Sequence, residues 1–254
     1  MFKTKIIINN KILLPIISFI LIIGMWELLD WILDINNLIL PSPHQIFLAI
    51  VNNLPLLLQE TGITTLEAII GFVIGFFFAY FFASLFVFSA STKNALYPYA
   101  IALKATPIFA LGPILVVWFG TGIFSKIIMS ALVCFFPILV NLVKGFTSVD
   151  SNTLDLFKTL GASKLQIFKK LRIPSSSSYL FPALKIASTM AIIGATIAEF
   201  IGASHGIGYL IVNSSYYLNT DVMFASILMI SIVGILFFYL IEFIERKIVF
   251  WEIN

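Results

Sequence analysis

Long, uninterrupted runs of apolar residues recur along the whole chain. Six of them reach the roughly 20 residues that a helix needs to cross the hydrocarbon core of a bilayer. The runs are continuous rather than alternating, which argues against a membrane β-barrel. The pattern therefore predicts six transmembrane helices, because a helix satisfies its own backbone groups in lipid. They are expected at residues 12–33, 63–88, 95–119, 123–143, 181–201 and 222–244.

Composition agrees with lipid as the main solvent. The chain is 60% hydrophobic and 11% charged, whereas soluble domains carry about 25% charged residues. No long polar linker separates the apolar runs, so we expect an all-α membrane protein with one transmembrane domain over residues 1–254.

Lysine and arginine residues fall in alternate loops. The segments 34–62, 120–122 and 202–221 contain none, while the chain start, the loop between spans 4 and 5 and the chain end are basic. Because basic residues accumulate on the cytoplasmic side, both termini and the loop between spans 4 and 5 are predicted to be cytoplasmic. The small net charge of +3 follows this topology and gives no indication of nucleic-acid binding.

The loop at about residues 147–182 combines helical segments with exposed apolar positions. Asp150 or Ser151 can cap a short helix over 153–160, and Gly161 is a natural terminator. A second amphipathic stretch, 163–171, is expected to end at Pro174 and the serine run 175–178. Apolar residues in this wet loop suggest a docking surface for another protein, or a loop that folds back on the bilayer. They are Leu156, Phe157, Leu160 and Phe168.

This loop resembles the coupling loop of bacterial ABC importer permeases, whose pattern is E-A-A-x-x-x-G, nine residues, then I-x-L-P. Gly161 is followed at that spacing by Leu171-Arg172-Ile173-Pro174, although Asp155, Leu156 and Phe157 replace the first three residues of the pattern. The resemblance implies that the short helix inserts into a cleft of an ATPase subunit. The residues implied in coupling are Asp155, Leu156, Phe157, Leu160, Gly161, Ala162 and Pro174.

The resemblance extends over about residues 38–251. LPSPHQIF, GFVIG, LKATPIFALGPILVVWFG, FFPILVN, AEFIGASHGIGYLI and ERKIVFW all resemble the subfamily that imports nitrate, sulfonates, taurine and thiamine-pyrimidine precursors. It implies a type I ABC importer permease in the bacterial inner membrane, with six spans and a cytoplasmic coupling helix between spans 4 and 5. The transported substrate is either a thiamine-pyrimidine precursor or related heterocycle, or a sulfonate- or nitrate-like anion.

The chain lacks the G-x-x-x-x-G-K-[ST] loop that cradles ATP phosphates. It is therefore expected to be a transport subunit rather than an enzyme, with no cofactor of its own and with ATP and Mg²⁺ bound by a partner. The expected partners are two cytoplasmic ATP-binding subunits, a second permease copy in a homodimer, an extracytoplasmic substrate-binding protein and the lipid bilayer. Two histidines and one cysteine, far apart in sequence, give no metal-ligand spacing.

Four residues within the spans are candidates for the translocation path. A cation in lipid faces a cavity or partner, or else snorkels to the interface, and Lys104 is open to both interpretations. Glu199 is either a gate group or an interfacial carboxylate with local hydrogen bonds. Pro107 is expected to introduce irregular backbone at the path, and Asn141 either lines the path or joins helices. Glu67 is expected at the interface.

Two short motifs have alternative interpretations. Gly71 and Gly75 form G-x-x-x-G, which permits close helix contact within one subunit or between two. Residues 202–206 match the G-x-S-x-G of a serine hydrolase, but the expected preceding element is a membrane helix rather than a strand. An outer turn followed by a short re-entrant helix at 208–217 is favoured. A secondary transporter driven by an ion gradient remains the main functional alternative, with a membrane serine hydrolase less favoured.

Overall fold

The structure is a computed structural model that describes residues 3–249, including the side chains of residues 13–102, 106, 107 and 109–249. Every regular element in the described part of the chain is a helix. The elements are α1 (Lys3–Leu33), α2 (Pro43–Asn52), α3 (Leu54–Phe88), α4 (Ala90–Ala105), α5 (Ile108–Phe119), α6 (Ile123–Thr147), α7 (Ser151–Thr159), α8 (Lys164–Ile167), the π-helical turn η1 (Phe168–Arg172), α9 (Ile173–Ser175), α10 (Ser177–Gly202), α11 (Ile207–Tyr216) and α12 (Thr220–Ile248).

Five described helices are long and apolar enough to cross a membrane, namely α1, α3, α6, α10 and α12. The predicted third span, 95–119, is instead divided into α4 and α5 at Thr106 and Pro107. The break lies where Pro107 was expected to introduce irregular backbone, because proline disfavours the helical conformation of the preceding residue and has no N–H to donate. Two further differences lie in the predicted loop 34–62, which contains α2 and the first turns of α3.

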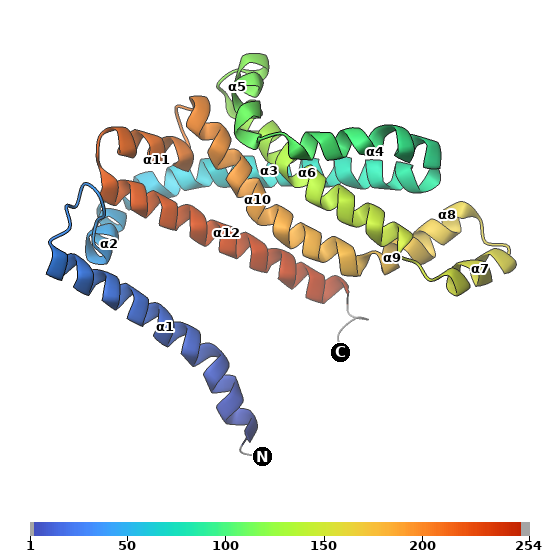
Figure 1. Ribbon diagram of the computed structural model, residues 1–254, viewed down its shortest axis with the longest axis horizontal. Coiled ribbons are helices and arrows are strands. Elements are labelled where there is room, and N and C mark those ends of the chain that lie inside the picture. The colour runs from blue at the N-terminus through green and yellow to red at the C-terminus, as the bar shows by residue number, and fades with distance from the viewer. Residues whose placement is uncertain (1–2, 250–254) are drawn as a thin grey trace.

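The long helices α3, α6, α10 and α12 pack against one another as a bundle (Figure 1). Helices α7, α8 and α9 lie at one end, called here the α7 end, and α11 lies at the other, called the α11 end. Helix α6 contacts both α3 and α10, and α10 also contacts α12. The 35 residues of α3 span about 52 Å at 1.5 Å per residue, so α3 is longer than the bilayer core is thick.

Small residues bring α3, α6 and α10 together at the centre of the bundle. A Cβ atom on Gly71 of α3 would lie 2.5 Å from the Cβ of Ser130 on α6, and one on Gly75 would lie 2.6 Å from the Ala131 carbonyl oxygen. On the α10 side, a Cβ on Gly194 would lie 3.0 Å from the Ser130 Cα. The G-x-x-x-G pair therefore serves helix packing within this chain.

Helix α1 stands apart from the bundle along most of its length (Figure 1). It is attached near the α11 end, where the Glu27 carboxylate lies 2.9 Å from Nδ1 of His44 and the Trp26 ring packs edge-on against Phe224. No residue of its most apolar stretch, within Leu13–Leu33, is buried by the other described residues. Its side chains are therefore open to lipid or to another chain.

Residues 148–176, called here the α7 loop, connect α6 to α10. The last part of this loop, from α8 to α9, is helical up to the start of α10. Pro174 was predicted to end the second amphipathic stretch, but it occupies the first turn of α9, and α10 begins at Ser177. A proline fits there because the first N–H groups of a helix have no intrahelical acceptor. The loop therefore delivers α8 and η1 almost directly into α10.

Candidate functional site

Helix α7 is fixed at its first turn by a side-chain cap. The Asp150 carboxylate accepts hydrogen bonds from the backbone N–H of Thr153, at 2.9 Å, and from its hydroxyl, at 3.1 Å. These hydrogen bonds lower the pKa of Asp150 below its ordinary value. The predicted cap and short helix are thus present, with the helix at Ser151–Thr159.

The last turn of α7 is closed by glycine. Gly161 has a φ of +75°, a conformation that a residue with a Cβ atom rarely adopts. Its N–H donates to the Lys158 carbonyl at 2.9 Å, and the N–H of Ala162 donates to the Phe157 carbonyl at 3.0 Å. This pair of bonds is the Schellman closure. It reverses the chain direction and confines α7 to about two and a half turns.

Two leucines at the exposed surface of α7 and its C-cap stand beside polar residues. Leu156 is 57% exposed and Leu160 is 75% exposed, whereas Phe157 is half-buried. Asp155 is exposed and pairs with Lys158 at 2.8 Å on the same helix. Leucines four residues apart share one face of a helix, so the two leucines project together from the α7 end.

Phe168 does not belong to this exposed surface, contrary to the sequence prediction. It is buried, and its ring packs against Phe88 and Phe146 with centroids 5.0 and 5.1 Å apart. The Arg172 guanidinium also donates to the Phe146 carbonyl at the end of α6. These contacts fasten the α7 loop to α3 and α6. The Lys185–Glu245 ion pair, at 2.6 Å, adds a link between α10 and α12 at the same end.

At the α11 end, buried carboxylates hold the turn between α10 and α11. Glu199, 2% exposed, accepts hydrogen bonds from the Thr64 hydroxyl at 2.6 Å and from the Gly208 N–H at 2.5 Å. The Thr64 oxygen in turn accepts from the N–H of Ile207 at 2.8 Å. Glu60 accepts from the N–H of Gly206 at 2.5 Å. The first turn of α11 is therefore bound to α3 and α10 through side-chain oxygens.

Glu67 belongs to the same cluster and is not interfacial as predicted. It is 3% exposed and lies close enough to Glu199 and Lys126 to interact electrostatically with both. Here the name carboxylate cluster denotes Glu60, Glu67 and Glu199 with Thr64 and Lys126. In the described part of the chain, no three metal-ligating side chains are placed to hold an ion.

Lys126 is the basic member of the cluster and was not predicted from the sequence. It is 1% exposed at the start of α6, and its ammonium donates to the Gly202 carbonyl at 3.2 Å and to the Thr121 carbonyl. A cation is favourable at the carbonyl end of α10. The sequence feature that could have identified it is a lysine three residues inside an apolar run, at the end of the run where the adjoining loops contain no other basic residue. Its favourable electrostatic interactions with Glu67 and Glu199 complete the cluster.

A cavity of about 450 Å³ lies beside the break between α4 and α5. Its polar lining residues are Thr106 and Asn141. The Asn141 side chain donates a hydrogen bond through Nδ2 to the Pro137 carbonyl of its own helix, at 2.8 Å, rather than to another helix. Pro107 lies in the break itself, and the side chain of Lys104 lies outside the described residues. Glu199 is not among the lining residues. The remaining lining residues are Leu111, Met129, Leu132, Val133, Phe136, Pro137, Val140, Ile186 and Met190.

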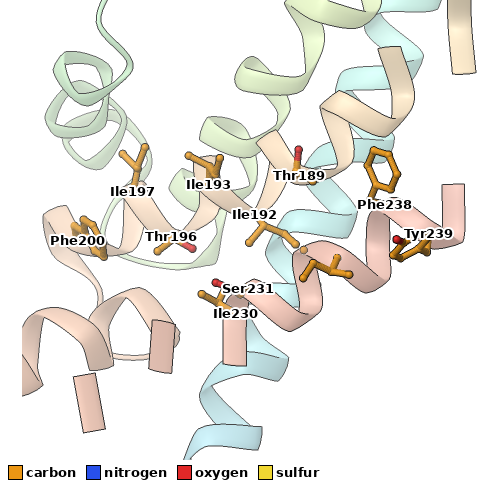
Figure 2. Close-up of a pocket in the computed structure, with 12 residues that line it drawn as sticks. Thr189, Ile192, Ile193, Thr196, Ile197, Phe200, Ile230, Ser231, Phe238 and Tyr239 are labelled. Carbon is orange, nitrogen blue, oxygen red and sulfur yellow. The ribbon is translucent and has the colours of Figure 1, made fainter. Parts of the chain in front are cut away.

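A larger cavity, of about 680 Å³, lies between α10 and α12. Figure 2 shows its mainly aliphatic and aromatic lining, with the hydroxyls of Thr189, Thr196, Ser231 and Tyr239 as the polar groups. The Thr189 and Ser231 hydroxyls donate to carbonyls of their own helices. The Thr196 hydroxyl, in contrast, is buried without a hydrogen-bond partner within residues 3–249.

Residues 202–206 form a turn rather than a hydrolase elbow, as was favoured from the sequence. The segment before Ser204 is the helix α10, whereas the motif requires a strand there. The neighbouring His205 faces Glu60, with Nδ1 3.5 Å from the carboxylate. The predicted re-entrant helix after this turn is present as α11.

Together, a bundle of apolar helices, a short helix with exposed leucines at one end and a polar cluster at the other are features of a membrane transport subunit. The profile of the family described as binding-protein-dependent transport system inner membrane component matches residues 71–250. The chain therefore belongs to this family and is a permease subunit of an ABC importer, a transport component without its own ATPase site.

Similar proteins agree with this assignment over nearly the full chain. A probable ABC transporter permease protein of Haemophilus influenzae is 31% identical, covering 96% of this chain and 99% of the relative. The formylaminopyrimidine transport permease protein ThiX of Halalkalibacterium halodurans is 32% identical, covering 94% and 95%. A crystal structure of an amino acid ABC transporter with histidines shares the fold, with a TM-score of 0.66, 18% identity, and coverage of 80% of this chain and 98% of the other.

The carboxylate cluster makes a direct prediction about stability. Glu199→Ala leaves the Gly208 N–H and the Thr64 hydroxyl without their acceptor, and should lower the free energy of unfolding by about 2–4 kcal/mol. Denaturation of the purified protein in detergent micelles measures the effect. The matched control is Glu242→Ala, which removes a pair with the exposed Arg246 and should cost less than about 1 kcal/mol. Equal losses from the two variants would contradict the role given to Glu199.

Proposed function

We propose that two copies of this chain form the membrane pore of an importer, and that each α7 is the helix on which a cytoplasmic ATPase subunit acts. The observation that carries this proposal is the apolar pair Leu156 and Leu160, exposed on a helix that is rigidly capped at both ends. Isolated apolar patches rimmed by charge are typical of protein docking sites. Asp155, Phe157, Gly161 and Ala162 shape the same helix, and Pro174 lies on its return to α10.

The distribution of charge supports a cytoplasmic α7 end. Basic residues gather where α3 meets α4, in the α7 loop and at the α7 ends of α10 and α12, whereas the loops near α11 contain none. Lys126, near the α11 end, is buried against backbone carbonyls rather than exposed to solvent. With α7 in the cytoplasm, both termini are cytoplasmic and the permease lies in the bacterial inner membrane.

The connection between the two ends supports transport by alternating access. Helix α6 leads into α7 and α10 follows the loop, and both helices reach the carboxylate cluster. Movement of α7 by an ATPase that binds ATP and Mg²⁺ is therefore carried to the opposite end. There, the hydrogen bonds of Glu199 and Glu60 hold α11 across the outer mouth until that movement releases it. A separate binding protein delivers the solute to this mouth.

The cavity beside Thr106 is the proposed solute site within the membrane. Phe136, Met129 and Met190 offer an aromatic ring and two polarisable thioethers. The Asn141 carboxamide uses one donor on Pro137 and retains its oxygen for a solute. A flat, uncharged heterocycle fits this lining, because it can stack on Phe136 and hydrogen-bond at its edge.

The similarity to ThiX, a formylaminopyrimidine transport permease, supports the same class of solute. The described lining contains no charged side chain, whereas a sulfonate or nitrate ion would need a cationic group or several donors. Lys104 precedes Thr106 by two residues and is the candidate for such a group. Because the described lining of the cavity is itself uncharged, we favour the heterocycle over the anion.

The docking role of α7 is tested by placing charge on its exposed face. Leu156→Asp together with Leu160→Asp should reduce co-purification of the ATPase subunit at least about tenfold, because docking would bury two carboxylates in an apolar cleft. Expression and detergent stability should stay unchanged, since both side chains are exposed. Leu165→Asp, an equally exposed position on α8, is the matched control and should retain the ATPase. Retention of the ATPase by the double variant would refute the docking assignment.

The solute class is tested by reconstituting the permease with its ATPase and binding protein in liposomes. ATP-dependent uptake of labelled formylaminopyrimidine is expected, with little uptake of taurine. Asn141→Leu should lower the uptake about fivefold through loss of one hydrogen bond, while Thr189→Val, in the other cavity, should have no effect. Uptake of taurine in place of the pyrimidine would overturn the choice of solute but not the assignment as an importer.

A further inference from the structure

A small basic cavity lies between the α7 loop and the end of α3. It has a volume of about 220 Å³, which is large enough for a phosphate group and its ester linkages. Its residues come from the last turn of α3, from α7 and from the segment α8–η1. They are Val87, Phe88, Leu154, Lys158, Lys164, Ile167, Phe168 and Arg172.

The floor of this basic cavity is apolar and firmly packed. Ile167 and Phe168 are buried, and the Phe168 ring contacts Phe88. Val87 and Phe88 are the last residues of the membrane helix α3, and Phe88 remains 45% exposed. The cavity therefore lies beside the end of a membrane helix, with an apolar floor beneath a rim that carries basic residues.

The rim of the cavity carries positive charge that the chain does not balance. Lys158 pairs with Asp155, but Lys164 and Arg172 have no ion-pair partner among the described residues. The Arg172 guanidinium donates to the Phe146 carbonyl, which is a neutral acceptor. Burial lowers the pKa of Arg172, and arginine nevertheless stays charged at neutral pH. Two cations thus point to an anionic ligand.

The two faces of α7 separate this cavity from the proposed ATPase dock. Leu154 and Lys158 line the cavity, whereas Leu156 and Leu160 are exposed. Positions two apart on a helix lie on roughly opposite sides, because each residue turns the helix by about 100°. A ligand in the cavity would therefore lie beneath α7 and leave the exposed leucines free.

We propose that this cavity binds the phosphate of an anionic glycerophospholipid from the cytoplasmic leaflet. The phosphate lies between Lys164 and Arg172, and an acyl chain lies against Phe88 and the end of α3. A lipid is favoured over a soluble anion because only a lipid covers the exposed apolar side of the site as well as its charge. The proposal rests on the proposed function, since it requires the α7 end to be cytoplasmic.

A bound lipid would support α7 from below while the ATPase acts on its other face. Because the floor is built on α3 and the rim on the α7 loop, the lipid would join these two parts of the chain. Coupling of ATP hydrolysis to transport should then depend on anionic lipid, and removal of one rim cation should reduce both lipid retention and this dependence.

The experiment uses the complete transporter, with ATPase and binding protein, in nanodiscs of phosphatidylcholine with or without phosphatidylglycerol. Retained phosphatidylglycerol is counted by native mass spectrometry after transfer to detergent, and solute-stimulated ATPase activity is measured in parallel. Lys164→Gln should retain about fivefold less phosphatidylglycerol, the effect of one interfacial cation, and should lose the stimulation by this lipid. Lys169→Gln, an equal loss of charge on an exposed residue outside the cavity, is the matched control and should behave like the unsubstituted protein.

Several outcomes would overturn the lipid site. Equal retention by Lys164→Gln and Lys169→Gln would show attraction to the basic loop in general. Competition by inorganic phosphate that matches the effect of phosphatidylglycerol would indicate a soluble anion. Loss of the ATPase subunit from Lys164→Gln, with unchanged lipid retention, would indicate a protein partner in the cavity. Failure of the proposed function is distinguishable, because the unsubstituted transporter would then show no ATP-dependent uptake in either lipid mixture.

Discussion

The close contact between α6 and α10 is the constraint on which the rest of the structure depends. Gly194 of α10 lies directly against Ser130 of α6, and the Cys134 thiol donates to the Ala187 carbonyl at 3.2 Å. Interiors packed at this density do not deform gradually, so the two helices are expected to move together. Since the α7 loop joins them in sequence, force applied to α7 acts on both helices at once.

The two ends of this pair of helices are built from different interactions. The α7 end combines aromatic packing around Phe168 with an exposed apolar helix, which suits a surface that a partner covers. The α11 end uses buried ionisable groups, which are costly in a membrane protein unless they are hydrogen-bonded or paired. Glu199 and Glu60 have backbone donors, and Lys126 has carbonyl acceptors. Such specific polar contacts favour one closed arrangement of α11. All of them can break together when α10 moves.

The general fold could be predicted from the sequence because it follows from one-dimensional signals. Apolar run length predicted the membrane helices, the Lys and Arg pattern predicted a common side for the loops, and Asp150 with Gly161 predicted both ends of α7. Local chemistry fixes these features. The irregular backbone at Pro107 was expected, whereas the helical path through Pro174 was missed. A proline is compatible with either a stop or a continuation of a helix, and the neighbouring helices decide between them.

The carboxylate cluster could be predicted only in part for a related reason. Glu199 was identified as a candidate, but Glu67 was assigned to the interface and Lys126 was overlooked. These residues come together only when α3, α6 and α10 have the right rotation and depth relative to one another. The close approach of the helices at Gly71 and Gly194 sets both, and the hydrophobic periodicity of a single sequence does not reveal them. Phe168 was likewise assigned to the surface, because an amphipathic stretch does not show which of its apolar residues another element covers.

The most direct measurement is of spin-label distances in the assembled transporter. In a Cys134→Ala background, labels are placed at the exposed Asn152→Cys on α7 or at Tyr216→Cys on α11, and the distance between the two copies is recorded by double electron–electron resonance. Rigid transmission through α6 and α10 predicts that ATP shortens the α7 distance and lengthens the α11 distance together. A change at α7 with no change at α11 would contradict it.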